Sequence, residues 1–276
     1  MIVKKIHNIV QKTSFWRFIR HNILEIHLAE HCNLNCTGCS HYSPIAEPAF
    51  CDLKVLDRNL CKLSKYEKSF HLIHLLGGEP LLNPDISIAF EIVRRHFKNT
   101  KIDLITNGIL LINGKLPNLF WEACRKFDIN IYVTLYPIRK INYEEIRQTC
   151  KKKGVKVNIG GDRTQDGSFT LFNLSPKGDG NKLVYRRCTE GRCWQLVGNK
   201  IYPCPQSAYV GHLNKKFDSN FLHRKGDYLE IDKINCRNLL LFKFRPKPFC
   251  AYCVFPRQNM RWKLSSHSAA EWIKQE

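Results

Sequence analysis

The sequence has no apolar run that approaches the roughly 20 residues needed to span a bilayer. Its N-terminus also lacks the uninterrupted apolar core and the small-residue cleavage site of a secretory signal peptide. No internal repeat and no low-complexity segment is present. These absences argue against a transmembrane or exported protein, and we expect the chain to be cytoplasmic.

Acidic residues are few: 24 Asp and Glu stand against 44 Lys and Arg, a net charge of +20. The basic residues are spread along the chain without a known nucleic-acid-binding motif, so we expect no nucleic acid partner. The charge suits an anionic substrate or contact with the inner face of a membrane. Residues 1–21 place Ile2, Ile6 and Ile9 at helical spacing. This predicts a basic amphipathic helix, either packed on the domain or anchored at a membrane surface.

Cysteine, in contrast, is abundant, with 13 in 276 residues. The cytosol keeps thiols reduced, so clustered cysteines favour metal ligation over disulfides. The length of the chain suits one large domain with a smaller appendage.

Strand-like apolar segments alternate with segments of helical pattern through the first 160 residues. This alternation predicts a parallel β-sheet covered by helices, an α/β fold. The expected strands are residues 23–30, 71–78, 101–108, 129–137 and 155–161, with a sixth at 168–174; the expected helices are 52–69, 85–98, 115–127 and 142–153.

In such folds the chemistry gathers at the carboxyl ends of the strands. Polar or flexible groups stand there after four expected strands: the cysteine loop, the glycines of residues 77–80, Thr106 with Asn107, and Thr134. We therefore expect the active site at this end of the sheet. Glu25, within the first strand, is a candidate to face the barrel lumen near the substrate.

The alternation of strand-like and helical segments ends after residue 162, where glycines, basic residues and further cysteines replace it. We expect a domain boundary near residue 180. Residues 193–204 have the pattern of a β-hairpin that turns at Gly198 and Asn199. Counting outward from this turn, Cys193 and Cys204 fall opposite each other on one face, so both thiols could ligate one metal centre.

Three cysteines, Cys32, Cys36 and Cys39, lie in the sequence CNLNCTGC after the first strand. A 4Fe-4S cluster has four irons that each take one outer ligand, so three thiols leave one iron open for a substrate or cofactor. The alternative is a zinc site completed by His31 or His41.

CNLNCTGC together with GGEP at residues 77–80 resembles the radical S-adenosylmethionine (SAM) enzymes, over about residues 22–160. The resemblance implies a partial (β/α)6 TIM-like barrel, which we place at residues 22–180. It also implies that Cys32, Cys36 and Cys39 hold a 4Fe-4S cluster. The open iron would be chelated by the amino and carboxylate groups of SAM.

The same resemblance suggests which residues bind SAM. The backbone of Gly77 and Gly78 and the carboxylate of Glu79, followed by Pro80, would meet the methionine amino group. Thr106 and Asn107 fall where such enzymes contact ribose, and Thr134 where a hydroxyl contacts the cofactor. The family's usual aromatic residue before the third cysteine is replaced by Gly38, so Tyr42 or His41 is expected to supply the adenine contact.

Residues 188–205 with CAYC at 250–253 resemble the auxiliary-cluster extensions called SPASM and Twitch, the shorter Twitch form fitting better. This implies a domain over residues 181–276 with a second 4Fe-4S cluster. Cys204, Cys250 and Cys253 would be ligands, and the fourth would be Cys188 or Cys193. The remaining thiol would be free to act as a hydrogen-atom donor. A zinc ribbon built from the same cysteines is the alternative reading.

The resemblance implies that an electron, delivered by a protein such as flavodoxin or ferredoxin, cleaves SAM to a 5'-deoxyadenosyl radical that abstracts a substrate hydrogen. Electron transfer to the second cluster would give dehydrogenation, and hydrogen return from a thiol would give epimerisation. The motif style is similar to that of enzymes acting on carbohydrates, and we expect such a substrate, anionic or lipid-linked. The alternatives are a ribosomal peptide substrate and a non-catalytic iron-sulfur or zinc protein.

Overall fold

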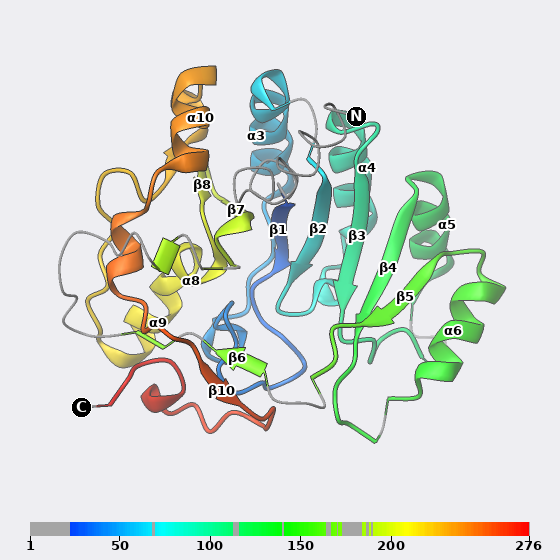
Figure 1. Cartoon of the computed structure of the whole chain (residues 1–276). Coiled ribbons are helices and arrows are strands. Elements are labelled where there is room, and N and C mark those ends of the chain that lie inside the picture. The colour runs from blue at the N-terminus through cyan, green and yellow to red at the C-terminus, as the bar shows by residue number, and fades with distance from the viewer. Residues whose placement is uncertain are drawn as a thin grey trace, which may run out of the picture.

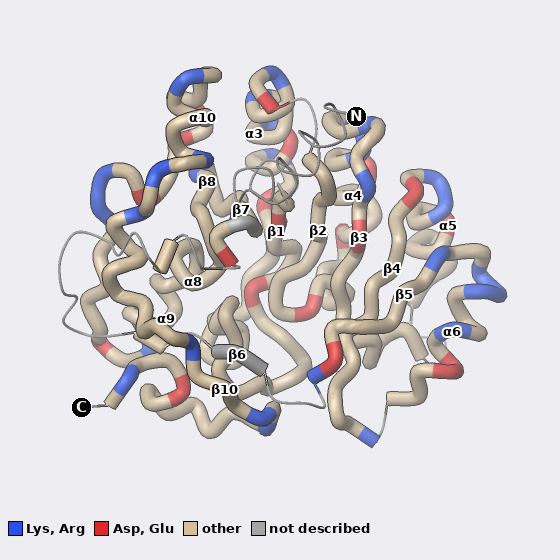
Figure 2. The backbone as a smooth tube through the Cα atoms, in the orientation of Figure 1, with Lys and Arg blue, Asp and Glu red and all other residues tan. Residues whose placement is uncertain are grey.

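The computed structural model describes residues 23–67, 70–112, 116–139, 141–163, 167–169, 171–172, 184–185, 188 and 190–275. The amphipathic helix expected over residues 1–21 lies outside these ranges. None of the helices within them is both long and apolar enough to cross a membrane. Figure 2 shows Lys and Arg distributed over several outer elements rather than gathered into one stripe.

Five parallel strands form the centre of the molecule in the order β5-β4-β3-β2-β1 (Figure 1). They are β1 (Ile23–Ala29), β2 (Leu72–Gly77), β3 (Lys101–Thr106), β4 (Ile129–Thr134) and β5 (Val157–Gly160). The predicted parallel sheet is confirmed, and it forms an open, partial TIM-like barrel. Each strand lies within its expected range.

The connections between these strands are the four predicted helices. They are α3 (Leu53–Tyr66), α4 (Ile86–His96), α5 (Asn118–Lys126) and α6 (Tyr143–Lys152). The carboxylate of Asp52 caps α3 by accepting hydrogen bonds from two backbone N–H groups of its first turn. Leu56, Leu60 and Leu63 recur at helical spacing on α3, and all three are buried in the main core. The helices thus cover one face of the sheet and leave the other face to the lumen.

The C-terminal half extends the same sheet across the boundary expected near residue 180. Strand β7 (Cys193–Val197) pairs in parallel with β1, and β8 (Lys200–Tyr202) and β9 (Leu229–Glu230) continue it in antiparallel. The predicted hairpin turn is confirmed, with Gly198 at a φ of +53°. Helices α8 (Pro205–Ala208), α9 (Val210–Phe217) and α10 (Cys236–Phe244) follow.

The sixth strand departs from expectation. Strand β6 (Gly167–Phe169) lies outside the main sheet and pairs in antiparallel with β10 (Gln258–Met260). A strand is therefore present at the start of the expected range 168–174, but its expected place in the main sheet is wrong, because it pairs with a strand near the C-terminus.

Short 3-10 helices complete the described elements. They are η1 (Ser43–Ile45), η2 (Pro80–Leu82), η3 (Glu190–Arg192), η4 (Ile231–Lys233), η5 (Pro248–Ala251) and η6 (Ala269–Glu271). A second, aromatic core joins the loop after β1 to the C-terminal half of the molecule and includes Tyr42, Phe172 and Trp272.

Two glycines at the end of β2 let the backbone approach the start of the cysteine loop. A Cβ atom on Gly77 would lie 2.1 Å from the carbonyl oxygen of Ala29, and one on Gly78 would lie 2.1 Å from that of His31. Gly77 also has a φ of +147°, which residues with a side chain rarely adopt. The contact partners are backbone atoms, which cannot rotate away.

We expect Gly78→Ala to lower the free energy of unfolding by about 2–3 kcal/mol, because the added methyl group forces the two loops apart. Gly211→Ala is the matched control, since a Cβ at Gly211 in α9 meets nothing within 4 Å. Urea denaturation of the three proteins measures the effect. An equal response to both substitutions would contradict the close approach.

Candidate functional site

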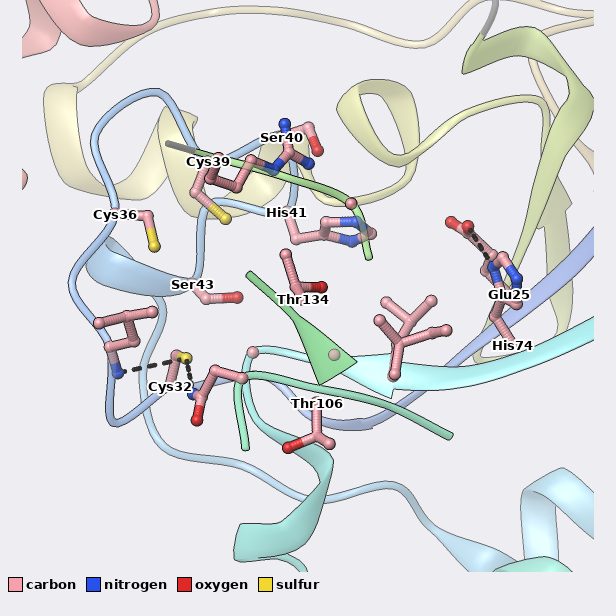
Figure 3. A pocket seen from close by; sticks show the side chains of 18 of the residues that line it. Glu25, Cys32, Cys36, Cys39, Ser40, His41, Ser43, His74, Thr106 and Thr134 are labelled. Atoms are coloured by element: carbon pink, nitrogen blue, oxygen red, sulfur yellow. Dashed lines mark hydrogen bonds and ion pairs between the residues drawn. The ribbon is translucent and has the colours of Figure 1, made fainter. Parts of the chain in front are cut away.

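A cavity of about 820 Å³ opens along the inner face and the carboxyl ends of β1 to β4. Figure 3 shows Cys32, Cys36 and Cys39 at one end of it, with their thiols directed into a shared space. Glu25 and His74 lie at the other end. The cavity therefore joins a sulfur-rich end to a polar end within the sheet.

Contacts with distant segments fix the cysteine loop. Two hydrogen bonds join the loop to the C-terminal segment. The N–H of Thr37 donates to the carbonyl oxygen of Lys263 at 3.0 Å, and Trp272 Nε1 donates to the carbonyl oxygen of Cys39 at 3.0 Å. Gly38 has a φ of +59°, where a residue with a side chain would be strained. The loop's own geometry thus explains why this position holds glycine rather than an aromatic residue.

The donor set at this end of the cavity fits an iron-sulfur cluster. Cys32 Sγ accepts hydrogen bonds from the N–H of Leu34 at 3.3 Å and from Asn107 Nδ2 at 3.7 Å, contacts that tune cluster ligands. Burial raises the pKa of the Cys36 thiol to about 11, so metal binding must displace its proton. Within the described ranges, no three His, Cys, Asp or Glu side chains converge on a single metal-ion position.

Glu79 lies behind the cavity wall rather than in it. Its side chain is fully buried and accepts hydrogen bonds from Thr106 Oγ1 at 2.7 Å and from the N–H groups of Asn107 at 2.9 Å and Leu81 at 3.1 Å. Neither Glu79 nor Pro80, which begins η2, lines the cavity, whereas Gly77 and Gly78 do. The carboxylate therefore joins the ends of β2 and β3.

The remaining expected cofactor contacts line the cavity. Thr106, Asn107 and Thr134 come from the ends of β3 and β4. The Asn107 side chain also donates to Asn33 Oδ1 at 2.7 Å, which ties the cysteine loop to β3. The hydroxyl of Thr106 already donates a hydrogen bond to the Glu79 carboxylate.

Both candidates for the adenine contact line the cavity as well. Tyr42 is buried, its ring lies 6.2 Å from that of Trp272, and its hydroxyl donates to the carbonyl of Gln206 at 3.4 Å. His41 Nδ1 lies 2.7 Å from Nε2 of His27. Burial, then the neighbouring His27, lower the pKa of His41 to about 3, so its ring is neutral.

A second group of cysteines surrounds a small cavity beside the first. Cys188, Cys204, Cys250 and Cys253 line it, whereas Cys193 does not. Lys247 and Arg257 also line it, and Arg257 Nη2 donates to Cys188 Sγ at 3.5 Å. The space is about 30 Å³, room for about two water molecules. A four-iron cluster would therefore require the surrounding side chains to move apart.

Cys193 occupies a different position from these four thiols. It lies opposite Ile23 of β1, and its thiol interacts with the carboxylate of Glu25. Burial, then the charge of Glu25, raise the pKa of Cys193 well above its ordinary value, so its thiol keeps its proton. Hairpin counting from sequence paired Cys193 with Cys204 but did not reveal that only Cys204 lines the four-cysteine cavity.

Several lining residues carried no sequence signal. Tyr136 and Trp262, whose rings lie 5.8 Å apart, flank Cys36. Gln206 and Arg257 line both cavities, and Arg257 Nη1 lies 3.1 Å from the Glu190 carboxylate. Trp262 and Arg257 belong to the C-terminal segment, which no motif links to the barrel.

Comparison with known proteins finds a family model that matches part of the chain. The radical SAM superfamily model covers residues 26–152. The chain is 36% identical over 118 residues to molybdenum cofactor biosynthesis protein 1 of Dictyostelium discoideum, covering 42% of this chain and 18% of that protein. The protein of the same name from Bos taurus is 32% identical over 127 residues, covering 46% and 19%. The chain thus spans about a fifth of the length of these curated relatives.

A solved structure shares the fold over more of the chain. BtrN in complex with AdoMet and 2-DOIA is similar with a TM-score of 0.51 and 15% identity, covering 84% of this chain and 92% of BtrN. The common fold therefore reaches past the matched domain into the C-terminal half.

The buried carboxyl group of Glu79 gives stability a pH dependence. Burial raises its pKa from 4.5 to about 7. The unfolded chain therefore loses this proton first, so stability that is full below pH 4.5 is lost as the pH rises through 7. Between pH 5 and 8, we expect the free energy of unfolding of the wild type to fall by about 2 kcal/mol relative to Glu79→Gln. Urea denaturation at each pH measures it, and a constant difference would mean that the three donors keep Glu79 ionised.

Proposed function

We propose, from the premise that residues 26–152 form a radical SAM domain, that this chain abstracts a hydrogen atom from a carbohydrate-type substrate. The proposal is carried by one observation: three thiols share one end of a cavity whose other end is a polar lumen. When bound there, a 4Fe-4S cluster supplies the electron that splits SAM into methionine and a 5'-deoxyadenosyl radical. Cys32, Cys36 and Cys39 would hold it.

The chain's own residues would position SAM and exclude water. The backbone of Gly77 and Gly78 faces the cavity and offers acceptors for the methionine ammonium group. Thr106, Asn107 and Thr134 would contact the ribose and the rest of the cofactor, with Tyr42 or His41 beside adenine. Glu79 would act indirectly, by holding the β2 and β3 ends together.

We further propose that residues 181–276 bind a second 4Fe-4S cluster, and that residues 22–180 form the catalytic barrel. The ligands of this cluster would be four cysteines that line one cavity: Cys188, Cys204, Cys250 and Cys253. Flavodoxin or ferredoxin remains our expectation for the electron donor. Because the cavity that the four cysteines line is small, we propose that their side chains move apart when the cluster binds.

Two outcomes of hydrogen abstraction remain as candidates, each favoured by one observation. Dehydrogenation is favoured by the adjacency of the two cavities, which share Gln206 and Arg257 as lining residues. Epimerisation is favoured by Cys193, a protonated thiol in contact with Glu25 of the lumen. In that route the Cys193 S–H bond breaks and its hydrogen atom is transferred to the substrate carbon radical, and the thiyl radical takes one electron from the electron donor and one proton from solvent to restore the thiol.

Reductive SAM cleavage tests the core of the proposal. We expect the anaerobically reconstituted chain, given SAM and dithionite, to form 5'-deoxyadenosine, measured by chromatography. Cys36→Ala should abolish it, because the two thiols that remain, Cys32 and Cys39, cannot retain the cluster. Cys61→Ala, an exposed cysteine outside the cavity, is the matched control and should retain it. An intact cluster without 5'-deoxyadenosine would instead support a non-catalytic iron-sulfur protein.

A pair of cysteine substitutions tests the second site. We expect Cys188→Ala to lower bound iron from about eight to about four atoms per chain, and Cys193→Ala to leave it unchanged. Iron analysis and electron paramagnetic resonance of both variants measure this. The reverse pattern would make Cys193 the ligand.

The same variants separate the two outcomes during turnover in deuterated water. Solvent deuterium at the reacting carbon that disappears in Cys193→Ala indicates epimerisation. A product oxidised by two electrons, without deuterium, indicates dehydrogenation.

A further inference from the structure

One row of polar residues crosses the floor of the lumen. Successive cross-strand partners on β7, β1, β2, β3 and β4 are Gln195, Glu25, His74, Asp103 and Asn130. Glu25, His74 and Asp103 line the cavity directly. We call these five residues the acceptor row, because two of them are carboxylates and two are amides with carbonyl oxygens.

Glu25 is a buried carboxylate that interacts, among the described residues, with His74, Gln195 and the Cys193 thiol. Its Oε1 atom lies 3.1 Å from His74 Nδ1, and its Oε2 atom accepts from Gln195 Nε2. In the part of the chain that the structure describes, no Lys or Arg forms an ion pair with it. Although burial opposes it, the hydrogen bond with His74 holds the pKa of Glu25 below its ordinary value. A buried negative charge of this kind is costly unless a positive group compensates it.

The neighbouring positions add further acceptors. Asp103 is 3% exposed, and its Oδ1 atom accepts a hydrogen bond from Asn130 Nδ2 at 3.2 Å. This bond uses the amide nitrogen of Asn130 and does not involve its carbonyl oxygen. The Oε1 atom of Gln195 is buried and has no hydrogen-bond partner among the described residues. Each of the four carboxylate oxygens of the row thus has a partner among the described residues and can accept a further hydrogen bond, and the Gln195 carbonyl oxygen has none.

The cations of this cavity lie at its edges or are already paired. Lys101 pairs with Asp103 at 2.9 Å but is 53% exposed, and Arg163 is exposed after β5. Arg257 pairs with Glu190 and Cys188. Although the chain carries a charge of +20, the buried charges of the lumen floor are those of two carboxylates.

We propose that the acceptor row binds a polyhydroxylated substrate that carries an ammonium group, with the ammonium on Glu25 and hydroxyl groups donating to the other acceptors. This inference rests on the proposed function and narrows its substrate class. It replaces the anionic substrate that the net charge alone suggested, because the buried charges of the lumen floor are carboxylates, whereas the basic residues that line the cavity are exposed or paired.

Three sugars that differ in one group test the proposal: glucosamine, glucose and glucuronate. Binding to the reconstituted, SAM-loaded chain is measured by calorimetry at pH 7 without reductant. We expect glucosamine to bind roughly tenfold or more tightly than glucose, and glucuronate most weakly, because a charge-assisted hydrogen bond discriminates by about that factor.

Two variants link this order to the row. Glu25→Gln should bring glucosamine and glucose to similar affinity. Lys101→Met changes a half-exposed side chain and should increase the preference for glucosamine, since it leaves Asp103 uncompensated. Asp57→Asn, on the outer helix α3, is the matched control and should leave the order unchanged.

Equal binding of the three sugars, a preference for glucuronate, failure of all three to bind, or a preference that survives Glu25→Gln would overturn the proposal. If Glu25→Gln does not fold, the wild-type order and the response to Lys101→Met decide the matter. Formation of 5'-deoxyadenosine is scored separately under dithionite, so a wrong substrate class and a wrong reaction give different results.

Discussion

The close contact between the end of β2 and the beginning of the cysteine loop holds the site together. The N–H of Gly78 donates to the carbonyl of Ala29 at 2.8 Å, and the N–H of Glu79 donates to that of His31 at 3.0 Å. The Glu79 carboxylate continues the connection to the β3 end. One continuous set of hydrogen bonds therefore sets the positions of three strand ends, and the three thiols are placed relative to them.

The resemblance to radical SAM enzymes implies that the backbone of these two glycines, Gly77 and Gly78, meets the methionine amino group of SAM. They are required first by the protein's own backbone, because a methyl group on either one would overlap a carbonyl oxygen. The two roles are compatible, since a backbone that packs on the loop from one side still presents its other side to the cavity. A sequence motif at a cofactor site can thus record folding and binding requirements together.

The parallel sheet and its four helices could be predicted because each depends on a local pattern, apolar runs for strands and helical spacing for the helices. Long-range pairing has no such pattern, which is why β6 was misplaced. The register that aligns Glu25 with His74 and Asp103 depends on the same long-range pairing. Likewise, the exclusion of Cys193 from the four-cysteine cavity follows from the pairing of β7 with β1, which sequence spacing does not report.

Pairing of β7 with β1 has a consequence for how the chain can be divided. Without residues 193–197, β1 would become the edge of the sheet and expose a row of unpaired backbone groups beside a largely apolar strand. Such edges recruit strands from other molecules. The cysteine-rich half therefore also covers the edge of β1. A fragment that ends at the expected boundary would expose this edge and tend to aggregate.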